Sequence, residues 1–516
     1  MAEWPPNNSE PRCFADIVHD TIYVYQPLCV LIDRPEFQRL RSIRQLSAVH
    51  LVYPTANHDR FTHSLGAYHL AFKFVSMLRS KFPDLHITSA EHLCVSVAAL
   101  MHDIGHGPFS HLFDGPFRAA VGGKWKHEDI SHRLVESIMH EGSVKEAFKA
   151  YLGDGEEYET NIDFIQELIH SKKFPKPLDQ VRDEISSKEE RKKWAEENWL
   201  PKGRDISRSF LFDIVSNDFD GHDVDKYDYM LRDAKFTGAS IALKTMNINR
   251  IMENTKVLLD PDFRFRRIIY ALKVALNDIV SVGEARQRLH DVVYQHPTVK
   301  IIGEMFVEIL LKINDHMKFR GSSGKLYRLS EIHRDIHAYV QVNDMILDEV
   351  YRSEKPELQE ARSIIDKIQK RDIPMKLVQC NYSNSTVHTS NEIPDLDTIC
   401  NAIKSELKRQ LPEKLQDDVF LIKRQLSKSS ESSMHPLRKV LVYDNRDARN
   451  GVNIDEGRYL SEEDICTRTT ADASVFGLDL SVSRHLPQEQ RQEIKEKFNE
   501  IVTEKGLRSD DNEDDE

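Results

Sequence analysis

Apolar residues recur every three or four positions along much of the chain, which is the spacing of an amphipathic helix. The clearest stretch, THSLGAYHLAFKFVSMLRSKF at residues 62–82, predicts a long helix. A second predicted helix, residues 88–103, begins with Thr88 and has Glu91 three residues later, the arrangement of a capping box. The same spacing predicts further helices over residues 33–46 with Asp33 as the N-cap, over 223–238 ended by Gly238, and over 281–297 ended by Pro297.

Patterns typical of strands are short and few. Residues 21–26 (TIYVYQ) and 439–445 (KVLVYDN) are rich in β-branched and aromatic residues and predict short strands. The helical signal weakens at about residue 375, and no internal repeat is visible. We therefore expect a mostly α fold with small β elements and an α+β C-terminal lobe. The predicted divisions are an N-terminal segment 1–13, a helical core 14–375, a C-terminal lobe 376–503 with a Ser-rich loop at 425–436, and an acidic, disordered tail 504–516.

Composition narrows the class of protein. The chain has six scattered cysteines without a CxxC pair, and it lacks an apolar run of about 18 residues. Its first residues do not combine a basic stretch with an apolar one, as a signal peptide would. We expect an intracellular protein, nuclear or cytoplasmic or both, with no membrane segment. A formal net charge of −13 disfavours strong non-specific binding to nucleic acid and leaves at most weak binding to single strands.

The densest candidate chemistry lies in LMHDIGHGPFSHLFDG, residues 100–115, at the end of a predicted helix. His102 and Asp103 end that helix, and RFTHSLG and DVDKYDYMLRD contribute His63 and Asp225. Two imidazoles and two carboxylates suit a divalent metal, zinc first, with iron, manganese or magnesium as alternatives. A lone histidine is more often a core residue, and an HD pair is common by chance. The three motifs in this order are far more specific.

These ordered motifs resemble the HD-domain phosphohydrolase superfamily. More closely, they resemble its eukaryotic SAM- and HD-domain-containing deoxynucleoside triphosphate triphosphohydrolases. The resemblance spans roughly residues 14–375, and we expect no SAM domain because no hundred-residue segment precedes this core. It implies an HD-domain helical core and an enzyme that cuts a dNTP at the α-phosphorus, releasing deoxynucleoside and triphosphate. The stretches that carry it are FQRLRSIRQL, YPTANHDRFTHSLG, MHDIGHGPFSHLFDG, KWKHE, FLFDIVSNDFDGHDVDKYDYMLRD and RQRLHDVVYQH.

The resemblance implies roles for the residues at matching positions. Its metal ligands are His63, His102, Asp103 and Asp225, and its catalytic set is His127, beside Glu128, with His106, His111 and Asp114. The sequence does not divide the acid and base roles among these histidines. The implied substrate contacts are Arg60, Lys226 and Arg286 at the phosphates, Gln45 at the sugar 3′-hydroxyl, Leu46 and Tyr294 crowding the 2′ position, and Tyr229, Asp233, His290 and Gln295 around sugar and base.

The resemblance further implies activation by GTP or dGTP with magnesium, coupled to assembly from dimer to tetramer. The matching guanine-site residues are Asp33, Gln38, Arg41 and Arg371, and Arg250 matches a neighbouring deoxynucleotide site. Residues 270–278 hold one lysine where the family has more cations, and Pro297 stands where it has lysine. We therefore expect the second site to bind a triphosphate more weakly.

Two other classes of function stay open. One is an HD-domain phosphodiesterase or nucleotidase that acts on another phosphate ester, which would not need sugar contacts such as Gln45, Tyr294 and Gln295. The other is a catalytically silent protein that binds nucleotides or single-stranded nucleic acid, which would not need a full ligand set together with His127. The resemblance favours the triphosphohydrolase and suggests an antiviral or replication-linked role through lower dNTP pools, in the nucleus or the cytoplasm.

Overall fold

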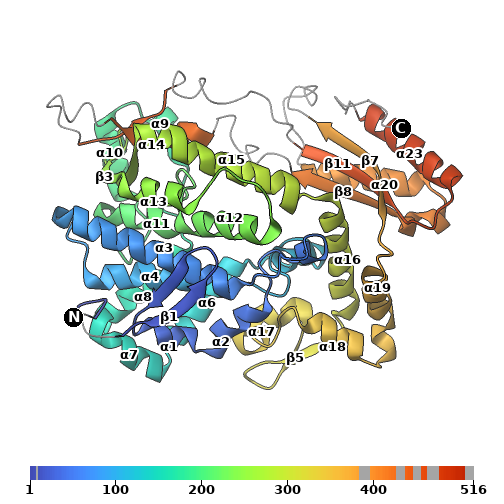
Figure 1. Cartoon of the computed structure of the whole chain (residues 1–516), viewed down its shortest axis with the longest axis horizontal. Coiled ribbons are helices and arrows are strands. Elements are labelled where there is room, and N and C mark those ends of the chain that lie inside the picture. Colours follow the sequence, from blue (N-terminus) through green and yellow to red (C-terminus); the bar gives the residue numbers. More distant parts are fainter. Residues whose placement is uncertain (7–9, 383–395, 426–435, 445–454, 462–475, 506–516) are drawn as a thin grey trace.

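The computed structural model describes residues 1–6, 10–382, 396–425, 436–444, 455–461 and 476–505. Helices dominate, the sheets are small, and the last part of the chain forms an α+β lobe at one end of the molecule (Figure 1). The expected fold class is confirmed. The helices are α1 (Leu28–Ile32), α2 (Pro35–Gln38), α3 (Arg60–Lys81), α4 (Ser89–Met101), α5 (Arg118–Ala120), α6 (His127–Met139), α7 (Gly142–Leu152), α8 (Glu156–Ile169), α9 (Leu178–Glu184), α10 (Lys188–Glu197), α11 (Phe212–Val215), α12 (Val224–Thr237), α13 (Thr245–Glu253), α14 (Leu272–Val274), α15 (Val280–Leu289), α16 (Pro297–Ile313), α17 (Ile336–Tyr339), α18 (Ile346–Arg352), α19 (Gln359–Gln369), α20 (Leu396–Gln410) and α23 (Gln488–Glu504).

The strands form four small sheets. β1 and β2 make an N-terminal antiparallel hairpin, β5 and β6 make a second two-stranded sheet, and β7, β11 and β8 make an antiparallel sheet in the C-terminal lobe, where α20 and α23 pack. The fourth sheet has the order β10–β9–β4–β3, and β9 runs parallel to β4. The bounds are β1 (Arg12–Asp16), β2 (Asp20–Val24), β3 (Thr255–Leu259), β4 (Arg266–Ala271), β5 (Lys318–Arg320), β6 (Leu326–Arg328), β7 (Met375–Tyr382), β8 (Val419–Gln425), β9 (Leu441–Tyr443), β10 (Arg458–Tyr459) and β11 (Phe476–Val482).

Helix α3 packs against both α4 and α12, and local signals fix where α3 and α4 begin. The Asp59 carboxylate accepts from the backbone N–H of Thr62 at 2.8 Å, so α3 starts at the next residue, Arg60. At α4 the predicted capping box is present: Thr88 Oγ1 accepts from the Glu91 N–H at 3.1 Å, and the Glu91 carboxylate accepts from the Thr88 N–H at 2.9 Å. Each such cap contributes about 1 kcal/mol and sets the register of the residues that follow.

Two predicted helices differ from the structure. Residues 33–46 form the short α2 and a 3₁₀ turn at Arg39–Ser42, and Asp33 follows α1 instead of capping a helix. The physical reason is Pro35, which holds Arg34 in an extended conformation and starts a new helix at the proline. Near residue 290, α15 passes into a π-helical turn at His290–Tyr294, and Pro297 is the first residue of α16.

The predicted helix at 223–238 is confirmed as α12, with Asp223 as its N-cap and Gly238, at φ +74°, as its C-cap. The strands predicted near residues 21–26 and 439–445 are confirmed as β2 and β9. Most of the predicted Ser-rich loop and acidic tail, residues 426–435 and 506–516, lies outside the described residues. Within the described ranges, no helix has the length and apolar character needed to cross a membrane.

Candidate metal centre and catalytic histidines

Three helices bring the predicted metal ligands to one point. His63 lies in the first turn of α3, His102 and Asp103 follow α4, and Asp225 lies in the first turn of α12. His63 Nε2 is 3.2 Å from His102 Nε2 and 3.0 Å from Asp225 Oδ1. Asp103 Oδ2 is 3.5 Å from the Nε2 atom of each histidine, and His102 Nε2 is 3.4 Å from Asp225 Oδ1. Donor atoms of His63, His102 and Asp225, from distant parts of the sequence, therefore lie within 4.8 Å of one another, and Asp103 approaches both histidines.

This donor set fits a divalent metal. Donors about 2.1 Å from a shared ion lie roughly 3.0 to 3.4 Å apart in octahedral or tetrahedral geometry, close to the separations found here. His63 Nδ1 donates to Asp228 Oδ2 at 2.8 Å, and His102 Nδ1 donates to the Ala99 carbonyl at 2.8 Å. Each histidine therefore carries its proton on Nδ1 and turns an Nε2 lone pair to the centre. With both Nε2 atoms unprotonated the facing lone pairs would repel one another, and a bound divalent cation would relieve that repulsion.

The carboxylates dominate the electrostatics of this centre. Burial lowers the pKa of His63, but the carboxylates of Asp225 and Asp228 outweigh it and raise that pKa to about 10. Burial raises the pKa of Asp103, but the charges of Arg60, His102 and His106 together outweigh it, and the pKa lies well below its ordinary value. Arg60 Nη1 donates to Asp103 Oδ2 at 2.5 Å, and both side chains are buried. The site thus keeps its carboxylates ionised and attracts positive charge.

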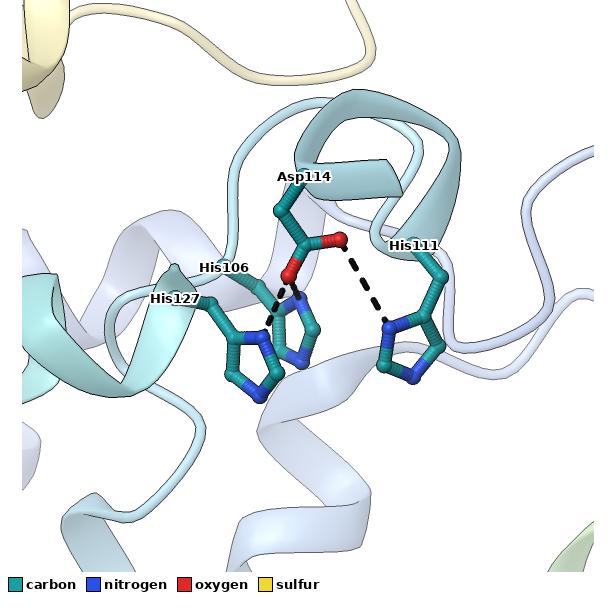
Figure 2. Close-up of side chains that lie close together, drawn as sticks. All are labelled: His106, His111, Asp114 and His127. Atoms are coloured by element: carbon teal, nitrogen blue, oxygen red, sulfur yellow. Dashed lines mark hydrogen bonds and ion pairs between the residues drawn. The ribbon is translucent and has the colours of Figure 1, made fainter. Parts of the chain in front are cut away.

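A second cluster lies beside the first and contains the predicted catalytic residues. The Asp114 carboxylate lies between three imidazoles (Figure 2). It accepts a hydrogen bond from His127 Nδ1, and its other oxygen is 3.6 Å from His111 Nδ1. The rings of His106 and His127 stack with centroids 3.8 Å apart, whereas the His111 side chain is 72% exposed. His106 is therefore buried, His127 stacks on it and is partly exposed, and His111 lies at the surface.

The two stacked histidines have opposite pKa shifts. Burial and the charges of Arg60 and His127 put the pKa of His106 well below its ordinary value. Burial also lowers the pKa of His127, but the hydrogen bond and charge of Asp114 outweigh it, so that pKa is raised. These shifts favour the neutral form of His106 and the protonated form of His127. In Figure 2 the second ring nitrogen of His127 points away from Asp114, so it can serve as a proton donor.

Known proteins are similar in sequence to this chain. The HD-domain family model matches residues 60–198. The chicken deoxynucleoside triphosphate triphosphohydrolase SAMHD1 is 33% identical over 451 residues, which cover 86% of this chain and 68% of the chicken protein. This chain belongs to the SAMHD1 family. The zebrafish SAMHD1 is 33% identical over 75% of this chain and 58% of its own length, and the human SAMHD1 is 36% identical over 69% and 53%. The chain thus spans only part of the length of these SAMHD1 proteins.

The substrate residues expected for a SAMHD1 relative lie on α3, α12, α15 and the segments beside them. Lys226 Nζ donates to Asp223 Oδ2 at 2.7 Å, and Tyr294 Oη donates to Asp233 Oδ2 at 2.6 Å. The His290 and Tyr294 rings lie 5.3 Å apart. Arg286 is close enough that its charge opposes the burial that raises the pKa of Tyr229 to about 12. Lys226, Tyr229, Arg286 and Tyr294 therefore form one neighbourhood.

Two of the predicted sugar and base contacts have an open hydrogen-bonding position. The side-chain oxygens Gln45 Oε1 and Gln295 Oε1 are buried and have no hydrogen-bond partner among the described residues. A buried polar atom without a partner costs free energy unless a ligand or water satisfies it. Leu46, beside Gln45, is half-buried and packs against the core. Both glutamines are thus available to a polar ligand.

The residues expected to bind activating nucleotides in a SAMHD1 relative lie in separate places. Gln38 Oε1 accepts from Arg41 Nε at 2.8 Å, and the Asp33 carboxylate accepts two hydrogen bonds from Arg12, at 2.6 and 2.8 Å. Arg371, at φ +59°, donates to the Leu51 carbonyl. Arg12, the hydrogen-bond partner of Asp33, was not among the residues predicted from the sequence.

Arg250 lies at a different site, on the wall of a cavity of about 990 Å³. Its Nη2 is 3.3 Å from Asp278 Oδ2, and Lys273 also lines the cavity. A carboxylate beside Arg250 offsets part of the positive charge there. None of Asp33, Gln38, Arg41 and Arg371 is among the described residues that line this cavity.

Sequence reasoning also missed the residues that hold the ligands in place. Asp228 Oδ2 accepts a hydrogen bond from His63 Nδ1, and Arg232 donates to both Asp228 oxygens at 2.9 Å. An Asp–Arg pair four residues apart on α12 was a local signal for this ion pair. Asp344 accepts from the Phe109 N–H at 2.6 Å and the Arg44 N–H at 2.9 Å, but it is 235 residues from Phe109, and no local pattern indicates that contact.

Proposed function

We propose that the chain is a metal-dependent dNTP triphosphohydrolase that cuts its substrate at the α-phosphorus, releasing a deoxynucleoside and triphosphate. One observation carries the proposal: Asp103 touches both clusters. Its Oδ2 lies 3.5 Å from His63 Nε2 and His102 Nε2, and its Oδ1 lies 3.3 Å from His106 Nε2. The metal centre and the stacked His106–His127 pair therefore lie on either side of one carboxylate. The names and identities of the SAMHD1 relatives support this reading.

His63, His102, Asp103 and Asp225 would hold the metal. A divalent ion there would polarise an α-phosphate oxygen and lower the pKa of a water molecule. Cleavage at the α-phosphorus makes the 5′ oxygen a leaving group, which needs a proton. His127 can supply it, because the hydrogen bond and charge of Asp114 favour its protonated form, and His106 supports the ring by stacking. His111, exposed beside Asp114, would contact the phosphates.

The remaining residues would either offset the charge of the phosphates or select the sugar and base. We infer that Arg60, Lys226 and Arg286 offset phosphate charge. Gln45 and Gln295 would satisfy their buried carbonyl oxygens with polar hydrogens of the sugar and base. Tyr229, Asp233 and His290 would complete that wall, and Leu46 and Tyr294 would crowd a 2′-hydroxyl and disfavour ribonucleotides.

We propose a guanine nucleotide, GTP or dGTP with magnesium, as activator at Asp33, Gln38 and Arg41, with Arg371 as a further contact and a dimer-to-tetramer change as the response. A second deoxynucleotide at Arg250 would bind weakly, because Asp278 offsets the charge of Arg250 and Lys273 adds one cation. An enzyme of this kind would lower dNTP pools in the nucleus or cytoplasm, with an antiviral or replication-linked role.

Product analysis tests the proposal. The full chain, supplied with Mn²⁺, is given dGTP or GTP, and ion-exchange chromatography separates the products. We expect deoxyguanosine with intact triphosphate from dGTP and no cleavage of GTP. A His127→Ala variant should lose turnover, whereas His140→Ala, on an exposed histidine outside the site, should match the parent. Monophosphate with pyrophosphate, or diphosphate with phosphate, would contradict cleavage of the bond between the 5′ oxygen and the α-phosphorus.

A further inference from the structure

The N-terminal hairpin, β1 and β2, reaches the rear of the metal centre through two side chains. His19, in the turn between the strands, has Nε2 2.7 Å from Asp228 Oδ1. Asp16, the last residue of β1, accepts from Arg232 Nη1 at 2.8 Å. The His19 imidazole is 1% exposed, and the Asp228 and Arg232 side chains are fully buried. The contact crosses 209 residues of sequence, so it joins the start of the chain to α12.

Asp228 is the junction of this network. Its Oδ2 accepts from His63 Nδ1 at 2.8 Å and from Arg232 Nε at 2.9 Å. Its Oδ1 accepts from His19 Nε2 at 2.7 Å and from Arg232 Nη2 at 2.9 Å. Because a carboxylate only accepts, His19 carries a proton on Nε2. Four donors thus fix the plane of this carboxylate, and three of them depend on the hairpin: His19 Nε2 directly, and the two Arg232 nitrogens through Asp16.

The packing of α3 fits this close approach. A Cβ atom at Gly66 would lie 1.8 Å from Asp228 Oδ1 and 2.5 Å from Arg232 Nη2. Gly66 is three residues after His63, so a larger residue there would push the network away from the ligand-bearing turn. The glycine of the HSLG motif is therefore required by the Asp228–Arg232 pair.

We propose that His19 and Asp16 are positioning residues for the metal ligand His63, and that the β1–β2 hairpin is part of the metal centre. His19 holds Asp228 directly, Asp16 holds Arg232, and Asp228 fixes the ring plane and Nδ1 proton of His63. If Asp228 turns, His63 Nε2 moves off the point where the four donors meet. Carboxylates behind histidine ligands orient the ring in this way, and their loss weakens metal binding by about 10- to 100-fold. The proposal rests on the metal centre of the proposed function.

Metal binding without any nucleotide tests the proposal. Apo protein is prepared from the full chain and from His19→Ala, His19→Gln, Asp16→Asn and Ile17→Ala, and Zn²⁺ affinity is measured by competition with a fluorescent chelator. Ile17 is the matched control, because it lies in the same turn and is 55% exposed. We expect His19→Ala to weaken Zn²⁺ binding about 10- to 100-fold, Asp16→Asn to weaken it less, and Ile17→Ala to match the parent. His19→Gln should recover most of the affinity, because its amide can donate to Asp228 Oδ1.

Thermal unfolding of each apo protein in EDTA separates positioning from folding. A His19→Ala protein that binds Zn²⁺ within twofold of the parent would overturn the proposal, whatever its unfolding temperature. So would a His19→Gln protein as weak as His19→Ala, because the hydrogen bond would then have no role. If His19→Ala does not fold, the isosteric Asp16→Asn decides: affinity equal to that of Ile17→Ala overturns the proposal. Turnover is not measured, so failure of dNTP hydrolysis would not be mistaken for failure here.

Discussion

Replacing Asp114 with asparagine should move the alkaline limb of the pH–rate profile to lower pH. The Asp114 side chain is 7% exposed, and it accepts a hydrogen bond from His127 Nδ1. Asparagine keeps the size of the side chain but removes its charge. Burial lowers the pKa of His127, and Asp114 is the main group that raises it. Without that charge, burial prevails and the pKa of His127 falls.

The size of the shift follows from the contact. Two unit charges about 4 Å apart, at an effective dielectric constant of about 20, interact by about 4 kcal/mol, or about 3 pKa units. Glu128 and Asp103 also raise the pKa of His127 and remain, so we expect a shift of about 1 to 2 units. His127 acts as a proton donor, so the rate is full below its pKa and is lost as pH rises through it. A lowered pKa therefore reduces the rate most at alkaline pH and least at acid pH.

The assay is kcat/KM for dGTP from about pH 5.5 to pH 9, measured by chromatography of released deoxyguanosine, because kcat/KM reports the free enzyme. Glu128→Gln is the matched control: Glu128 Oε2 lies 3.4 Å from the same His127 nitrogen, but its side chain is 28% exposed. Solvent screens the Glu128–His127 pair, so the alkaline limb of the Glu128→Gln profile should move by less than about half a pH unit. An Asp114→Asn rate reduced equally at every pH, with its limb unmoved, would refute the reasoning.

Three other changes probe the metal, the fold and the activator. Asp225→Asn should lower bound metal at least about tenfold by mass spectrometry of the dialysed protein, because it removes a charged donor; unchanged content would exclude Asp225 as a ligand. Asp344→Ala should lower the free energy of unfolding in urea by about 3 kcal/mol, because the buried N–H groups of Phe109 and Arg44 lose a carboxylate acceptor; a loss under about 1 kcal/mol would contradict this. Asp33→Ala should abolish stimulation by GTP and the tetramer seen by mass photometry while leaving metal content intact; persistent tetramers would argue against a guanine site there.

Helix ends that depend on hydrogen bonds and backbone conformation within a few residues were predicted from the sequence. Thr88 and Glu91 cap α4 through hydrogen bonds within four residues, and Gly238 ends α12 because it adopts a left-handed conformation. The range 33–46 was wrong as a single helix because helical spacing outweighed Pro35 in the prediction. The π-helical turn at His290–Tyr294 was missed because one extra residue per turn barely changes an apolar pattern.

The candidate metal ligands were predicted from sequence motifs, whereas the residues that position and support them were not. His63, His102, Asp103 and Asp225 stand in conspicuous sequence motifs, and the structure places them near one another. His19 contacts Asp228 behind the metal centre, and Asp344 contacts the backbone of Phe109. Both contacts span more than two hundred residues and depend on the finished fold. Phe109 and Ser110, at φ +59° and +53°, lie in a conformation that non-glycine residues rarely adopt, which only surrounding contacts can hold.

The parallel pairing of β9 with β4 has a practical consequence for dividing the chain. β9 (Leu441–Tyr443) pairs with Tyr270 and Ala271 at the end of β4, and β10 lies beyond β9 in the same sheet. A fragment cut near residue 375 would lose both strands and leave an unpaired edge on β4. Unpaired edges recruit other strands and promote aggregation. An expression fragment of the helical core should therefore extend past Tyr459. Poor solubility of a shorter fragment would result from the unpaired edge of β4 and not from a defect in the core.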